Sequence, residues 1–350
     1  KSEEEISKKP KDPDDKRRLE QLFTVAQSLG SFFLDEMEQP CVSIKVKDHV
    51  ETYKVRSDSF KEFLRYSNLK KNHSVTGKNT MDAVIDHLAA WCKYEGEVKK
   101  THVRVGEGNG NIYLDLCDKD RHIVEITPTG WNVAKSTPVL FVRTPLQSAL
   151  PIPVKGGNLR DLQAILGIKD DSTFVMIISW MVFAMTTSGP FPFLVLNGQE
   201  GSGKSTKLRA IRSLIDPSPA SNNQMPSSVR ELFIHAFNVW VVDYDNLSIC
   251  PQWFSDALCL VSTGGANSPR TLYTNSDQIV FKVKKPVILS GINSIARNPD
   301  FADRSITLNF EKIGDKNRLS ENVFWDNFTQ LHSAFLGCLC DAVSCGLRNI

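Results

Sequence analysis

A glycine-rich turn between an apolar strand and a helix constrains this chain more than any other feature. Residues 193–206 are FLVLNGQEGSGKST, in which Gly198 is followed, after four residues, by Gly203, Lys204 and Ser205. This spacing is that of the Walker A phosphate-binding loop. A chance glycine-rich turn is the alternative. The apolar strand before the turn and the helical pattern after it favour the phosphate-binding loop.

The residue types of this turn suit the binding of a nucleoside triphosphate. Glycines adopt backbone angles closed to other residues, so that successive N–H groups can point at one anion. Lys204 is expected to reach the β- and γ-phosphates of ATP or GTP, and the Ser205 hydroxyl to bind Mg²⁺. The predicted nucleotide-binding residues are Gly198, Gln199, Glu200, Gly201, Ser202, Gly203, Lys204, Ser205 and Thr206.

A second apolar strand supplies the carboxylate that such a site needs. Residues 239–246 are VWVVDYDN, and Asp243 and Asp245 are two apart, so both face the same side of a strand. Either one is a candidate for the catalytic, magnesium-binding aspartate. Asn246 stands where many ATPases of this type place a glutamate base.

Polar residues follow a third buried strand, at 286–293. Ser290 or Asn293 is expected to sense the γ-phosphate beside the carboxylate. Arg304, or alternatively Arg297, is expected to stabilise transition-state charge in a neighbouring subunit's site. A surface salt bridge is the alternative for each arginine.

Basic residues between 266 and 285 suggest a nucleic-acid contact. Arg270, Lys282 and Lys284 fall in a loop or hairpin and could contact phosphates. A solvated strand edge protected by lysines is the alternative. The net charge of the 350-residue chain, +2, does not by itself indicate nucleic-acid binding.

Composition indicates a globular chain with a substantial core, since 41% of residues are hydrophobic and 23% charged. The most apolar run, 174–185, is shorter than the roughly 20 residues that span a bilayer, so no membrane partner is expected. The 8 cysteines contain no Cys-x-x-Cys pair, which favours reduced thiols and a cytoplasmic location.

The order of strand and helix patterns predicts an α/β fold, preceded by a smaller α+β domain. A linker and an amphipathic helix are expected over 1–34, and an α+β accessory domain without a catalytic constellation over 35–153. The ATPase domain is expected over 154–315. Residues 316–350 are predicted to be a helical segment that is truncated at its end.

Several motifs occur together in a characteristic order. Beside the loop at 198–205 they are Asp-Asn-Leu-Ser (245–248), Ser-Thr-Gly-Gly (262–265), Arg-x-Leu-Tyr-Thr (270–274), Pro-Val-Ile-Leu (286–289) and Ala-Asp-Arg (302–304). This set resembles the helicase-like AAA+ ATPase of phage, plasmid and mobile-element primase-helicases, which is related to superfamily three helicases. The resemblance extends from about residue 20 to 310 and includes residues 111–116 and 130–131.

The resemblance implies a P-loop ATPase with an AAA+-like parallel sheet that binds ATP and Mg²⁺ and drives a DNA helicase. It favours Asp245 over Asp243, makes Arg304 the finger in trans, and implies a ring, a hexamer, threading single-stranded DNA past Arg270. The family's sensor asparagine falls on Ser290, which is a departure. The primase part that often accompanies this ATPase is not recognisable in these residues, so it is expected either outside this stretch of sequence or on another protein, as a primase or polymerase partner.

Two other function classes remain as alternatives. One is an ATPase switch that remodels protein or nucleic acid without unwinding it, for example in phage defence. The other is a small-molecule kinase, which is disfavoured because no acceptor pocket is evident. Ring formation discriminates the helicase from the kinase, and strand separation discriminates it from the switch.

Overall fold

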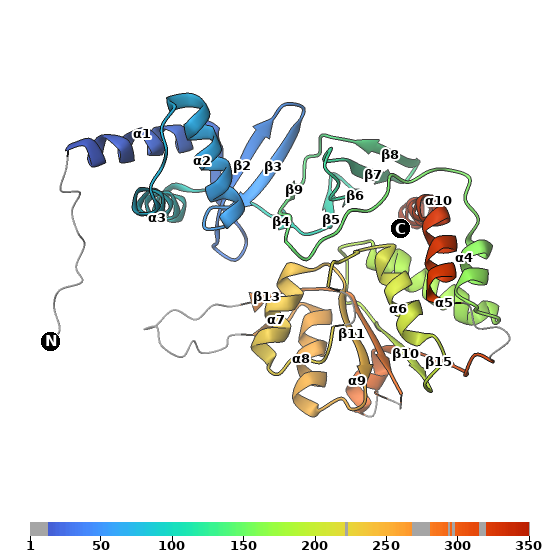
Figure 1. Ribbon diagram of the computed structural model, residues 1–350. Coiled ribbons are helices and arrows are strands. Elements are labelled where there is room, and N and C mark those ends of the chain that lie inside the picture. The colour runs from blue at the N-terminus through green and yellow to red at the C-terminus, as the bar shows by residue number, and fades with distance from the viewer. Residues whose placement is uncertain are drawn as a thin grey trace. The chain divides into compact units, whose positions relative to one another are not determined.

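The computed structural model describes residues 13–220, 223–267, 281–292, 295, 298–314 and 320–349. The chain divides into two compact units (Figure 1). Unit 1 comprises residues 1–101 and 140–142, and unit 2 comprises residues 102–139 and 143–350. The sequence predicted the segments 1–34, 35–153, 154–315 and 316–350, whereas this division groups residues 102–139 with residues 143–350.

Unit 1 combines an antiparallel sheet, in the order β1-β2-β3, with three helices. Apolar side chains of the helices, such as Leu22, Phe60 and Leu88, are buried in one core with Val42 of the sheet. The Ser57 hydroxyl begins one helix by accepting a hydrogen bond from a backbone N–H of its first turn. The elements are α1 (Pro13–Leu29), β1 (Gly30–Leu34), β2 (Pro40–Val46), β3 (His49–Lys54), α2 (Asp58–Asn72) and α3 (Lys78–Glu95).

Unit 2 contains an antiparallel sheet in the order β5-β6-β7-β8, which packs on the long C-terminal helix α10 (Glu321–Arg348). The Trp131 indole N–H donates to Asp341 Oδ1 at 2.8 Å, and the Ser344 hydroxyl donates to the Thr127 carbonyl at 2.6 Å. The apolar face of this sheet therefore joins the core of the downstream half rather than that of unit 1. Its strands are β5 (Val105–Gly108), β6 (Asn111–Asp115), β7 (Ile123–Thr127) and β8 (Gly130–Ala134).

The second sheet of unit 2 is parallel and has the order β11-β14-β10-β15. The two inner strands, β10 and β14, are apolar along most of their length, as expected where both faces are covered. The parallel sheet with helices that the sequence predicted is thus present. The four strands are β11 (Val242–Leu247), β14 (Val287–Gly291), β10 (Phe193–Gly198) and β15 (Ser305–Phe310).

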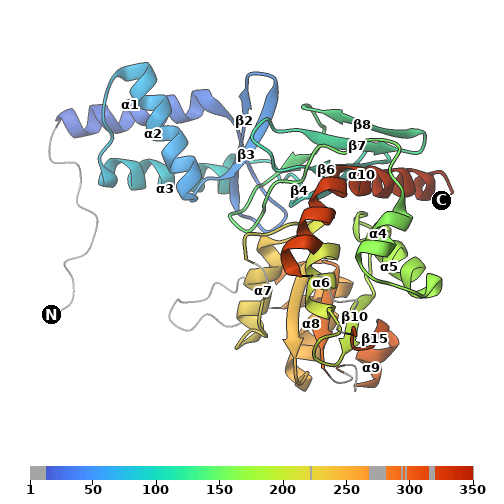
Figure 2. The ribbon, with the colours of Figure 1, turned by 45° about the vertical axis from the view of Figure 1, so that its right-hand side comes forward.

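Helices cover both faces of the parallel sheet. Asp243 and Asp245 point toward the face on which α6 packs, whereas the ring of Tyr244 between them contacts Phe254 of α8 on the other face. The long helix α10 packs against β7, β8, α4 and α5 (Figure 2). The helices are α4 (Leu159–Ile165), α5 (Asp171–Ala184), α6 (Lys204–Ser213), α7 (Val229–Asn238), α8 (Gln252–Thr263) and α9 (Pro299–Asp303).

Four short strands complete the chain. In unit 2, β12 (Ala266–Asn267) pairs antiparallel with β13 (Phe281–Lys282). β4 (Thr101–His102) and β9 (Leu140–Phe141) occur where the chain passes from one unit to the other. Among the described residues, no helix is both long and apolar enough to cross a bilayer.

Candidate functional site

The glycine-rich loop (residues 198–203) connects the end of β10 to the start of α6. Gly201 and Gly203 have φ values of 81° and 71°, a region that favours glycine. A Cβ on Gly198 would lie 2.5 Å from Ser202 Oγ and 2.7 Å from the Phe310 carbonyl oxygen, so a side chain there has no room. The three glycines therefore have conformational or steric reasons to be glycine.

Two carbonyl groups of this loop accept backbone hydrogen bonds, one from within the loop and one from the segment that follows β15. The Gln199 carbonyl accepts from the Ser202 amide at 3.2 Å, and the Gly201 carbonyl accepts from the Ile313 amide at 3.1 Å. The first amide groups of α6 have no acceptor within the helix. The N-terminal end of a helix is also the positive end of its dipole. The arrangement leaves backbone donors available for an anion at the start of α6.

Lys207 holds two further carbonyls of the loop. Its Nζ donates to the Ser202 carbonyl at 3.0 Å, and its amide donates to the Gly203 carbonyl at 3.0 Å. The ammonium group lies 5.1 Å from the centroid of the Phe310 ring. Burial lowers the pKa of Lys207 to about 8, so the amine still carries its proton at pH 7.

The remaining predicted nucleotide-binding residues occupy different depths. Lys204 is buried at the first position of α6, and Ser205 and Thr206 are half-buried behind it. Gln199 and Glu200 are exposed at the tip of the loop. The structure therefore places the predicted lysine and serine in the first turn of α6, directly after the loop.

Asp245, at the end of β11, is the carboxylate that meets this loop. The Ser205 hydroxyl donates to Asp245 Oδ1 at 3.0 Å, across from α6. The Ser290 hydroxyl on β14 donates to the same oxygen. The Asn246 amide donates to it at 2.9 Å, and Asn246 has a φ of 56°. Two hydroxyls and one carboxylate from three elements thus converge, an oxygen-rich set of the kind that Mg²⁺ prefers.

Asp243 has a different environment, although it lies on the same face of β11. Its Oδ1 lies 2.6 Å from Arg212 Nη1 and accepts from Asn223 Nδ2 at 2.8 Å. Burial raises the pKa of Asp243, although the charge of Arg212 acts against this. The structure therefore brings Asp245, and not Asp243, to Ser205.

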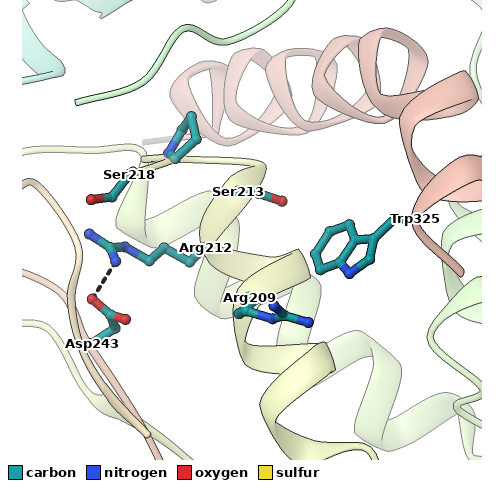
Figure 3. Close-up of a pocket in the computed structure, with 7 residues that line it drawn as sticks. Arg209, Arg212, Ser213, Ser218, Asp243 and Trp325 are labelled. Carbon is teal, nitrogen blue, oxygen red and sulfur yellow. Dashed lines mark ion pairs between the residues drawn. The ribbon is translucent and has the colours of Figure 1, made fainter. Parts of the chain in front are cut away.

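The Arg212–Asp243 pair lies beside a pocket at the C-terminal end of α6 (Figure 3). Arg209 and Trp325 form the opposite wall, with the guanidinium carbon 5.1 Å from the centroid of the indole ring. Ser213, Pro217 and Ser218 complete the lining. This pocket is at the other end of α6 from the glycine-rich loop.

A fully buried ion pair fixes the end of α6 to the start of β11. Arg104 Nε lies 2.9 Å from Asp216 Oδ1, and both side chains are inaccessible. Asp216 Oδ2 accepts from the amides of Trp240 and Val241 at 2.7 and 3.0 Å. Arg104 also donates to the Asp115 carbonyl at 3.0 Å, which connects the antiparallel sheet to the same point.

Arg304 follows α9 and immediately precedes β15. Its guanidinium pairs with Asp300 at 3.0 Å on the surface of its own chain, and the side chain is 43% exposed. Its backbone carbonyl accepts from the Phe193 amide at 2.8 Å, which positions it at the start of the strand next to β10.

The other predicted residues fall in or near undescribed segments. Arg270, Asn293 and Arg297 lie outside the described residues. Only the backbone of Lys282 is described, in β13, and Lys284 is exposed. The predicted contacts of these residues stay predictions.

Sequence reasoning did not identify Lys207, Arg212 or Asn223. Lys207 is three residues after Lys204, a spacing that places both near one face of a helix, and this was the available signal. Asn223 comes from a connecting segment and has no sequence signature. Elsewhere, Asp118, Asp120 and His122 bring one ligand atom each within 4.8 Å of one another between β6 and β7. Asp118 and His122 already bond to each other there.

Comparison with solved structures identifies relatives of the fold. Two apo structures of the NrS-1 C-terminal region match with TM-scores of 0.52 and 0.50, each at 13% identity. These matches cover 97% and 92% of this chain and 72% and 71% of the other chains. A JCV helicase structure matches at 15% identity over 52% of this chain and 53% of that one, with a TM-score of 0.34 that carries no weight here.

Family membership comes from the sequence. A search of curated proteins found no match. The model of the family described as actinomycete integrative conjugative element replication protein matches residues 161–348, more than half of the chain. These residues include the parallel sheet, the glycine-rich loop and α10. The chain therefore belongs to the actinomycete integrative conjugative element replication protein family.

Proposed function

We propose that this protein is an ATP-hydrolysing DNA helicase or translocase that acts in the replication of a mobile element. The contact between the Ser205 hydroxyl and Asp245 at the mouth of the glycine-rich loop carries the proposal. This pair supplies the hydroxyl and the carboxylate of a magnesium–nucleotide site at the Walker A spacing. Membership of a family of replication proteins gives the site its biological context.

ATP would bind with its phosphates at the start of α6. The backbone amides and the positive end of the helix suit the phosphate oxygens, and Lys204, the first residue of α6, would reach the β- and γ-phosphates. Ser205 and Asp245 would hold Mg²⁺, directly or through water. When bound, Mg²⁺ bridges phosphate oxygens and neutralises charge that develops during hydrolysis.

Hydrolysis needs a positioned water and a counter-charge for the γ-phosphate. Ser290 bonds to Asp245 and lies on the strand next to it, a place suited to contact the γ-phosphate or the attacking water. Asn246 offers an amide where a glutamate base is usual, so water activation would depend on Asp245 and Ser290. Arg304 is exposed beside the sheet and would complete the site of a neighbouring subunit.

A site shared between subunits requires an assembly, and we propose a ring, a hexamer, with single-stranded DNA as the ligand. Arg270, Lys282 and Lys284 are the proposed phosphate contacts. A primase or polymerase partner would supply the synthesis that replication requires.

The proposal is tested by measuring ATP hydrolysis with and without single-stranded DNA. We expect DNA to stimulate turnover, and Lys204→Ala and Arg304→Ala each to abolish it. Mixing the two inactive variants should restore some turnover, because one subunit then offers an intact loop and the other an intact arginine. Asp300→Ala is the matched control, since it removes the surface partner of Arg304 but leaves the arginine in place.

Two results would contradict the helicase proposal. Turnover that ignores DNA, together with a mixture that stays inactive, would favour an ATPase switch. Turnover that DNA stimulates without any strand separation in a duplex-unwinding assay would leave translocation as the activity.

A further inference from the structure

A second lysine lies buried directly beneath the glycine-rich loop. Lys207 is only 5% exposed, and its Nζ is 3.0 Å from the Ser202 carbonyl oxygen. A Cβ on Gly203 would lie 3.0 Å from the same Nζ, so the ammonium group is packed against the loop backbone. The Phe310 ring, at 5.1 Å, forms another contact of the ammonium group.

This ammonium group has no carboxylate partner among the residues that the structure describes. Its contacts there are a carbonyl dipole and an aromatic ring, which are weaker compensation than an ion pair. Burying an unpaired charge destabilises a fold unless other groups stabilise it. The free protein therefore holds a positive charge for which the described part of the chain offers no acidic partner.

The position of Lys207 also controls the direction of the loop backbone. Holding the Ser202 carbonyl from below turns that peptide unit away from the open side of the loop. The carbonyl of the preceding residue, Gly201, is also engaged, because it accepts from the Ile313 amide. When carbonyls point inward to the protein, the neighbouring N–H groups can point outward at one anion.

We propose that Lys207 is a positioning residue of the nucleotide site. It holds the glycine-rich loop in the anion-binding conformation, and the phosphates of the bound nucleotide are the compensating charge for its buried ammonium group. This inference rests on the proposed nucleotide site and adds a residue outside the Walker A spacing.

The proposal predicts that one substitution, Lys207→Met, weakens nucleotide binding without destabilising the nucleotide-free protein. Replacing Lys207 by methionine keeps most of the side-chain volume and the contact with Phe310 but removes the charge and the donor. The nucleotide-free protein should be as stable as wild type or more stable, since an unpaired buried charge is gone. Nucleotide affinity should fall, because the Ser202 carbonyl is no longer held and the positive charge is absent. If Lys207 had only a structural role, its replacement would lower nucleotide affinity only together with stability.

Lys285 offers a matched control within the same unit. It is also buried, with its Nζ 4.8 Å from the centroid of the Trp240 ring. It precedes β14, whereas the glycine-rich loop follows β10, so in this parallel sheet the two lysines are at opposite ends. Lys285→Met makes the same chemical change away from the loop.

The experiment measures the Kd of Mg-ADP by calorimetry and the melting temperature of the nucleotide-free protein, for wild type, Lys207→Met, Lys207→Gln, Lys285→Met and Lys204→Ala. For Lys207→Met we expect Kd to rise about ten- to a hundredfold, the range for a lost hydrogen bond to a charged group, without a lower melting temperature. Lys207→Gln keeps a donor without the charge and should be intermediate. Lys285→Met should keep the wild-type Kd.

The possible failures are distinguishable. If wild type binds Mg-ADP and both Lys207 variants bind within about threefold of it, the inference about Lys207 is wrong. It is equally wrong if Lys285→Met weakens binding as much as Lys207→Met, or if the Kd rises only together with a lower melting temperature in both Lys207 variants. If wild type itself does not bind Mg-ADP and resembles Lys204→Ala, the proposed nucleotide site fails instead.

Discussion

An aspartate of β11 contacts α6 near each end of the helix, and the two aspartates have different kinds of partner. At the start of α6, Asp245 accepts from the hydroxyls of Ser205 and Ser290, which are neutral donors. At the end of α6, Asp243 forms a buried ion pair with Arg212. The two aspartates are two residues apart on one strand, and their side chains point to the same face.

The carboxylate of Asp245 can still bind a cation, whereas that of Asp243 is already paired with the guanidinium of Arg212. Hydroxyl donors leave the negative charge of Asp245 uncompensated, so a cation can take their place as its partner. Arg212 neutralises Asp243 and fixes it, which suits a structural contact between helix and strand. The ion pair of Arg212 with Asp243 thus holds α6 and β11 together at the end of the helix that lies away from Asp245.

The largest effect is expected when the Arg212–Asp243 ion pair is broken at the C-terminal end of α6, which we call the structural end. Asp243→Asn leaves Arg212 buried and charged without its partner. We therefore expect the free energy of unfolding to fall by about 3–5 kcal/mol, as for other buried pairs that lose one member. Urea denaturation of the nucleotide-free protein measures this. At a temperature where the variant is folded, ATP turnover should stay near that of wild type.

A large loss of turnover in folded Asp243→Asn would contradict the comparison, since it would place Asp243 in the chemistry. Asp245→Asn serves as the reciprocal measurement for this outcome.

The next effect concerns catalysis at the other end of the contact. Asp245→Asn keeps the shape of the side chain and its ability to accept from Ser205, but removes the charge that would attract Mg²⁺. ATP turnover at saturating nucleotide should fall by about a hundredfold or more, the range for removing one preorganised charge-stabilising group. The urea midpoint should not fall. If turnover survives and stability drops, the roles of the two aspartates are reversed.

The parallel sheet and the loop could be predicted because their signals are local. A continuous apolar strand, three glycines and a following Lys-Ser predict the order strand, loop and helix without reference to distant parts of the chain; that these residues bind a nucleotide stays a proposal. The choice between Asp243 and Asp245 has no such local signal, because residues two apart on a strand face the same side. The family resemblance favoured Asp245, but the physical difference between the two lies in their partners on α6, and Arg212 is 31 positions from Asp243 along the chain.

The division of the chain into two units also depends on contacts between residues that are distant in the sequence. Strands β5 to β8 show the pattern of side chains expected for a sheet with one apolar face. Nothing in their sequence indicates which core that face will join. Trp131 bonds to Asp341, and Arg104 pairs with Asp216, both from far along the chain. Such long-range pairs have no local pattern, so the sequence indicated the strands but not the unit to which they belong.

A smaller effect is expected where Ser290 meets Asp245. Ser290→Ala removes one neutral hydroxyl from the carboxylate and leaves Ser205 in place. The loss of one hydrogen bond, about 1 kcal/mol, corresponds to a fall in turnover of about fivefold. Single-turnover and steady-state ATP hydrolysis measure it, with the KM for ATP. An unchanged rate would show that Ser290 is a structural partner of Asp245 alone.

A similarly small effect, on stability rather than on turnover, is expected from removing both charges of the Arg212–Asp243 pair. The double variant Arg212→Met with Asp243→Asn no longer buries an unpaired guanidinium, and Asn223 can still donate to the amide oxygen at position 243. We expect its free energy of unfolding to lie within about 1–2 kcal/mol of wild type, because apolar replacements of buried pairs are often nearly neutral. The double-mutant cycle, completed with Arg212→Met, gives the coupling between the two residues. A double variant less stable than Asp243→Asn alone would mean that Arg212 acts through packing, and that charge neutralisation is not what distinguishes the two ends.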